Sequence, residues 1–134
     1  KDYEGAKAYA IQAKETADRA KSEADTNKQQ TRDEAQAVIN RVSPGLDDAR
    51  TSLSSAPSGK GADEDLAQLS ADLGQAEANL NDARSNLSIG KFKDALAQAR
   101  SSESKLSQVQ GSVQTANQKI EAWKELNKPW FDKL

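Results

Sequence analysis

The sequence contains no cysteine, no histidine and no methionine, and only 4% of its residues are aromatic. Without histidine and cysteine, the chain lacks the usual general base, the usual thiol nucleophile and the usual ligands of transition metals. The absence of cysteine also excludes disulfides, which is compatible with any compartment. The sequence therefore predicts a protein that is not an enzyme, with no catalytic residues, no cofactor and no metal site.

Long hydrophobic runs and an excess of one charge are missing as well. No apolar run approaches the roughly 20 residues of a transmembrane helix, and the sequence does not open on a signal peptide. Charged residues make up 30% of the chain but leave a net charge of only -2, so we expect no nucleic-acid partner. Because the chain opens on Lys1, we interpret it as a processed product or an excised fragment.

Alanine supplies most of the limited apolar content, at 22 of the 134 positions. Alanine loses no side-chain rotamer freedom in a helix. It lets two helices approach closely but buries little area at each contact. This composition favours a long, thin helical bundle.

Small residues recur at alternating steps of three and four from Tyr3 onward. This spacing places them in one row along a helix face, a seam that can pack against another helix. The seam begins with Ala6, Ala10, Ala13, Ala17, Ala20 and Ala24. It turns polar at Asn27 and Thr31 and resumes at Ala35. The spacing predicts one helix over residues 2–42.

Proline and glycine then divide the middle of the chain. Pro44 disfavours helix at the residue before it, and Ser43 suits the start of a new helix. We therefore expect a helix over 44–55, a break over 57–61, where "PSGKG" forbids regular helix, and a continuation over 62–88. The second limb has the clearest seam, with Leu66, Leu69, Leu73, Ala76, Leu80, Ala83 and Leu87.

The last helix is predicted over 91–127. It follows the turn "SIGKF", where Gly90 suits a left-handed helix end, and it stops before Pro129. Residues 128–134 are then a short aromatic tail. The fold class predicted is all-α, an elongated antiparallel three-helix bundle whose middle helix is interrupted near 57–61 and whose three limbs are nearly equal in length.

The start of the chain resembles the start of the predicted last helix. A shift of 89 residues brings Tyr3 onto Phe92 and three alanines onto Ala95, Ala97 and Ala99. Either composition alone aligns two alanine-rich helices, or the chain contains an internal repeat. If it is a repeat, each unit consists of a helix, a turn and a longer helix, and the chain begins inside the first unit, without its leading helix. That missing helix was cut off, is disordered or comes from another subunit.

The segment "LNDARSNLSIGKFKDALAQAR" resembles the hairpin of a tetratricopeptide repeat at Gly90, Phe92 and Ala95. Over most of its length, the chain resembles the short alanine-rich helical proteins of bacterial envelopes that share a domain of unknown function. Those proteins carry hairpins with a G-[DK]-[YF]-x-x-A turn behind an export leader. This resemblance implies an exported helical protein, periplasmic or otherwise associated with the envelope, and supplies no active-site residues.

Few residues suggest binding. "SGKG" at 58–61 lacks the first glycine and the strand of a phosphate loop, and "DED" at 63–65 suits the first turn of a helix. Trp130 and Phe131 follow the helix-ending proline, so they either cover the end of the bundle or form an anchor for a partner. The other candidate contacts are Ala10, Ala13, Ala17 and Ala20, along the first helix.

These observations predict a non-enzymatic structural or protein-interaction module that self-associates or binds a protein partner. The alternative is a helical bundle that binds a small ligand in a cavity between its helices. Alanine seams leave little room for such a cavity.

Overall fold

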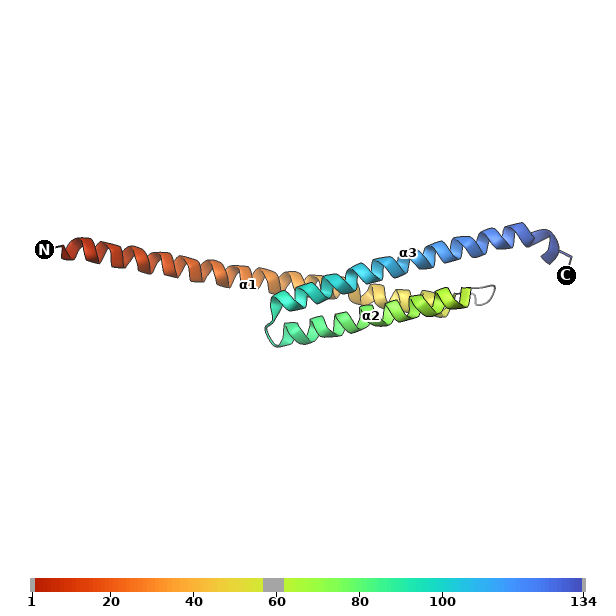
Figure 1. Ribbon diagram of the computed structural model, residues 1–134, viewed down its shortest axis with the longest axis horizontal. Coiled ribbons are helices and arrows are strands. Elements are labelled where there is room, and N and C mark those ends of the chain that lie inside the picture. Colours follow the sequence, from red (N-terminus) through yellow and green to blue (C-terminus); the bar gives the residue numbers. More distant parts are fainter. Residues whose placement is uncertain (1, 57–61, 134) are drawn as a thin grey trace.

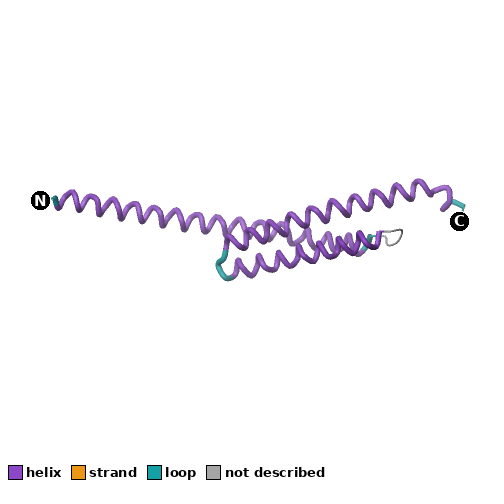
Figure 2. The backbone as a smooth tube through the Cα atoms, viewed as in Figure 1, coloured by secondary structure: helices purple, strands orange, loops and turns teal. Residues whose placement is uncertain are grey.

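The computed structural model describes residues 2–56 and 62–133, and almost all of them are helical (Figure 1; Figure 2). Helix α1 spans Tyr3–Ser54, α2 spans Ala62–Ser88 and α3 spans Phe92–Phe131. Helix α2 runs antiparallel to α1 and α3, and each helix packs against the other two. The all-α three-helix bundle expected from the sequence is confirmed.

The three helices differ in length and are staggered. They contain 52, 27 and 40 residues, so the expectation of three nearly equal limbs is wrong. The bundle is about as long as α2. The first half of α1 extends past one end of the bundle, and the last part of α3 extends past the other (Figure 1).

Pro44 does not end a helix. The predicted boundary between 2–42 and 44–55 is wrong, because α1 continues through Pro44 to Ser54. Residues 44–54 therefore belong to the first helix and not to a first limb of the middle helix. The predicted break at 57–61 lies outside the described residues.

Packing explains why the helix survives a proline. Val42, Leu46 and Ala49 are all buried on the core side of α1, and their steps of four and three keep the seam in phase across Pro44. The Pro44 ring is exposed and takes no space in the core. A proline inside a helix costs about 3 kcal/mol, whereas burying one large aliphatic side chain contributes about 1.5–3 kcal/mol. Burial of the seam on both sides of Pro44 outweighs the cost.

Gly45, which follows Pro44, allows α3 to approach α1 closely. A Cβ atom at this position would lie 2.7 Å from Cδ2 of Leu106. The "PG" pair, which predicted a break, thus includes a glycine whose missing side chain makes room for a core leucine.

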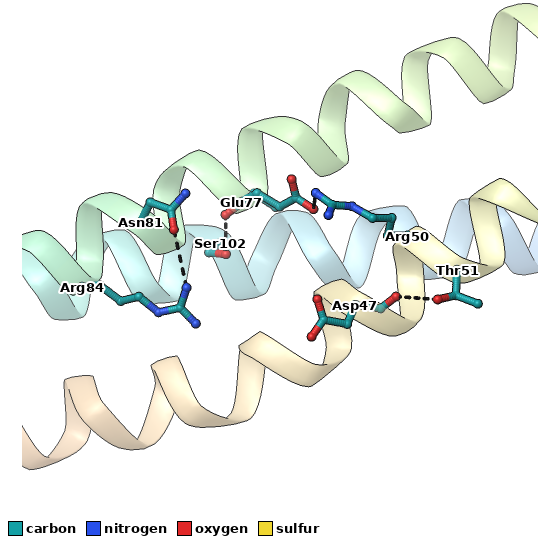
Figure 3. A network of polar contacts seen from close by, with 8 residues as sticks. Asp47, Arg50, Thr51, Glu77, Asn81, Arg84 and Ser102 are labelled. Atoms are coloured by element: carbon teal, nitrogen blue, oxygen red, sulfur yellow. Dashed lines mark hydrogen bonds and ion pairs between the residues drawn. The ribbon is translucent and has the colours of Figure 1, made fainter.

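The core lies between α2, the first half of α3 and residues 35–53 of α1. Its members are Val38, Ile39, Val42, Leu46, Ala49, Leu69, Leu73, Ala76, Leu80, Ala83, Ala99, Leu106, Val109 and Val113. Ser102 is fully buried among them, and its Oγ donates a hydrogen bond of 2.7 Å to the Ala76 carbonyl (Figure 3). The leucine seam predicted for α2 therefore faces the core, with Leu66 and Leu87 half-buried at its ends.

Ion pairs join the rim of α1 to both neighbouring helices. Arg50 pairs with Glu77 of α2 (Figure 3), and Arg41 pairs with Glu103 of α3 at 2.7 Å. Arg100 of α3 pairs with Glu34 of α1. These side chains are largely exposed, and such pairs contribute only about 0.2–1 kcal/mol each, so they orient the helices more than they stabilise the bundle.

The turn between α2 and α3 matches its prediction. Gly90 has a φ of 81°, the left-handed conformation that glycine adopts without steric cost. The N–H of Gly90 donates to the Leu87 carbonyl, and the N–H of Lys91 donates to that of Asn86. Together they close the end of α2 as a Schellman motif.

Candidate interaction surfaces

Residues 3–30 of α1, which we call the N-terminal arm, extend beyond the bundle. Every residue of this arm is exposed except Gly5, which is half-buried. The candidate contacts Ala10, Ala13, Ala17 and Ala20 are therefore on an open helix face that neither of the other helices covers. The reason is the stagger, because α2 and the start of α3 lie level with the second half of α1 (Figure 1).

A row of lysines flanks the alanine face of the N-terminal arm. Its members are Lys7, Lys14, Lys21 and Lys28, spaced by seven residues. In a heptad with Ala10, Ala17 and Ala24 at position a, they occupy position e, beside the seam. At the foot of the arm, Lys28 Nζ lies 5.6 Å from the centre of the Phe92 ring. The alanine spacing did not predict this row, although the seven-residue spacing of its lysines is a sequence signal.

Residues 114–131 of α3, which we call the C-terminal arm, extend from the opposite end of the bundle. The expectation that α3 stops near Asn127 is wrong, because it continues through Pro129 to Phe131. Proline fixes φ near its helical value and removes one donor. The last turn still closes, with the Asp132 N–H donating to the Lys128 carbonyl.

This continuation changes the position of Trp130. The seam that is buried in the bundle as far as Val113 continues along the arm at alternating steps of three and four. It passes through Ala116, Ile120, Trp123, Asn127 and Trp130. Trp130 thus lies on the seam of a projecting helix, not in a tail that covers the bundle, and its side chain is 59% exposed.

The C-terminal arm carries the largest apolar side chains outside the core. Leu126 is 81% exposed, and Ile120 and Trp123 are half-buried. The side chain of Phe131, the other candidate contact, lies outside the described residues.

A groove lies at the foot of the C-terminal arm, where α1 ends beside α3. It has a volume of about 580 Å³ and is lined by Asp48 and Ala49 of α1 and by Val113, Asn117 and Glu121 of α3. Of its two carboxylates, that of Glu121 pairs with Lys124 at 3.0 Å, and Val113, which is only 8% exposed, is among the apolar lining residues.

Further grooves run along the described helices and are open to solvent. One lies between α1 and the end of α2, and another lies where the α2–α3 turn meets α1. Such open grooves bury little of a small molecule, whereas ligand sites usually enclose most of it. They do not favour the small-ligand alternative.

Acidic side chains do not gather into a metal site within 2–56 and 62–133, where no group of three or more potential ligands is suitably placed. The acidic triplet 63–65 lies in the first turn of α2, as its composition suggested. Among the described helices, none is long and apolar enough to cross a membrane.

Comparisons of this chain with protein families, with curated proteins and with solved structures found no significant match.

Proposed function

We propose that this protein is a non-enzymatic structural module that binds other helices along its two projecting arms. The observation that carries the proposal is the stagger of the bundle. It leaves two helix faces with seam spacing uncovered after the three helices have packed. A helix with a regular seam is ordinarily stabilised by packing of that seam against another helix.

The internal correspondence supports this proposal. Ala95, Ala99 and Val109 on α3 are buried by α1 and α2, whereas their counterparts Ala6, Ala10 and Ala20 on the N-terminal arm are exposed. If the two segments are repeats, the arm has the sequence of a third bundle helix without the two helices that cover it. Its natural partner is then a helix or helical pair from outside these 134 residues.

The lysine row indicates the chemistry of that partner. Charges at the flanks of a helix seam select the partner and its orientation. Two N-terminal arms packed antiparallel would place their lysine rows side by side, which is unfavourable. We therefore propose that the arm binds a helix whose flank is acidic.

We also propose that the protein acts in a bacterial cell envelope, in the periplasm. This part of the proposal rests on the resemblance to alanine-rich envelope proteins and on no contact in the structure.

A binding experiment with two synthetic helices tests the proposed function. Both probes carry an alanine seam at heptad spacing, one with glutamates and the other with lysines at the flanking positions. We expect the full chain to bind the glutamate probe more tightly. The double variant Lys14→Glu with Lys21→Glu should reverse this preference, and Lys119→Glu on the C-terminal arm should not. Calorimetric titration at low salt measures each affinity, because added salt weakens exposed pairs.

Equal affinity for the two probes would contradict the acidic partner. The absence of binding to either probe, in a chain that also stays monomeric, would contradict the interaction function.

A further inference from the structure

We propose that two copies of this protein form an antiparallel dimer through their C-terminal arms, with the Trp130 side chain of each copy in the groove at the foot of the other copy's arm. This inference rests on the proposed function as a helix-binding module and specifies the partner of one arm.

The first argument is the continuity of the α3 seam. Phe92 through Trp130 keep one heptad register, and α1 and α2 cover this seam only as far as Val113. Beyond that point α1 ends, the start of α2 still lies beside the first part of the arm, and the rest of the arm continues past both helices (Figure 1). A second helix on this face would take the place that α1 occupies within the bundle.

The second argument is that the arm complements itself in length. Its seam runs from Val113 at the foot to Trp130 at the tip, with a midpoint between Glu121 and Ala122. Two arms packed antiparallel about this midpoint overlap along their whole length. The tip of each arm, with Trp130, then reaches the groove at the foot of the other arm, and Ile120 faces Trp123.

The third argument is the shape and charge of the groove. The groove lies where the tryptophan of the second copy arrives, and Asp48 lines its α1 side. About the same midpoint, Lys133 at the tip lies level with Gln110 of the groove and comes close to Asp48. In a twofold dimer, each such contact is made twice.

The lysines of the arm decide the orientation. In a parallel, in-register pair, Lys119 at position g would face Lys124 at position e of the second copy, because these positions meet across a parallel coiled coil. In the antiparallel pair, Lys119 faces Leu126 and Lys124 faces Asn117. The antiparallel arrangement therefore avoids both repulsive pairs and covers Leu126, the most exposed leucine of the arm.

Sedimentation equilibrium of the full chain tests whether the dimer forms. We expect a monomer–dimer equilibrium in which Trp130→Ala and Leu126→Ala each weaken association at least about tenfold, as expected for large apolar anchors of an interface. Glu125→Ala, on the outer side of the same arm, is the matched control and should leave association unchanged. All three variants should keep the melting temperature of the diluted monomer, because the arm lies outside the bundle.

Spin labels test the orientation, and the absence of natural cysteine makes single-site labelling direct. In the antiparallel dimer, labels at Ala122→Cys lie about one helix spacing apart, roughly 10 Å. Labels at Asp132→Cys lie about 30 Å apart at 1.5 Å per residue. Two equally short distances would indicate a parallel pair and would overturn the proposal.

A strict monomer, or a dimer that Trp130→Ala does not weaken, would also overturn it. If association is instead lost on Ala13→Glu in the N-terminal arm, the antiparallel C-terminal pair is wrong but the proposed helix-binding function stands.

Discussion

Gly45 and Gly74 are two helical glycines in different surroundings. At Gly45 a Cβ atom would meet Leu106, whereas at Gly74 nothing lies within 4 Å of the added atom. Glycine in a helix interior is less favourable than alanine by about 1 kcal/mol. Only at Gly45 does the structure supply a reason to accept that cost.

We expect Gly74→Ala to stabilise the protein by about 0.5–1 kcal/mol, because only helix propensity changes. Gly45→Ala should bring no gain or should destabilise by up to about 2 kcal/mol, because overpacking a core costs about 1–3 kcal/mol. Urea unfolding of both variants measures the difference. If Gly45→Ala stabilises as much as its control, the close contact between α1 and α3 is wrong.

The leucines of α2 give a second residue-scale prediction. Leu73 and Leu80 are 5% and 3% exposed, whereas Ala71 on the same helix is exposed. Replacing a core leucine by alanine costs about 2–5 kcal/mol, so Leu73→Ala and Leu80→Ala should melt well below wild type, with Ala71→Ser close to it. Equal melting temperatures for all three would show that the α2 register is wrong.

At the scale of the element, the two prolines show where sequence patterns conflict. Pro44 and Pro129 each predicted a helix end, and each lies inside a helix. Around both of them the heptad phase continues without interruption, from Val42 to Leu46 and from Asn127 to Trp130. The heptad spacing of the seam residues therefore predicts the helix better than the presence of a proline does. The spacing reflects the side-chain packing that offsets the local cost of the proline.

Removing the interior proline should therefore stabilise α1. Pro44→Ala restores the N–H that can donate to the Asn40 carbonyl and should raise the free energy of unfolding by about 1–3 kcal/mol. Pro129→Ala, on an arm outside the core, is the matched control and should leave the unfolding midpoint nearly unchanged. A loss of stability or of helical circular dichroism in Pro44→Ala would mean that the chain does bend or break there.

The sequence predicted the helical class, the α2 seam and the Gly90 turn because each depends on local spacing. It did not predict the stagger, because seam spacing says that a face is suited to packing but not which helix covers it. Ala10 and Ala99 occupy equivalent positions in their seams, yet one is exposed and the other fully buried. Likewise, the sequence predicts Trp130 in a tail, because its place on the seam depends on α3 continuing through Pro129.

At the scale of the whole molecule, the three helices are offset along the bundle axis, so the molecule is much longer than its packed core. A core as long as α2 holds the molecule together, and each end presents one helix with an open face (Figure 1). This shape suits a protein that connects partners at two separate places, since the arms leave the bundle in opposite directions.

Small-angle X-ray scattering extrapolated to zero concentration tests this staggered shape most directly, with Trp130→Ala used to keep the protein monomeric. At about 1.5 Å per residue, α1 spans about 78 Å and the C-terminal arm adds about 27 Å. We expect a maximum dimension of about 105 Å. A maximum near 80 Å, the length of α1 alone, would mean that the C-terminal arm folds back on the bundle and would contradict the two open arms.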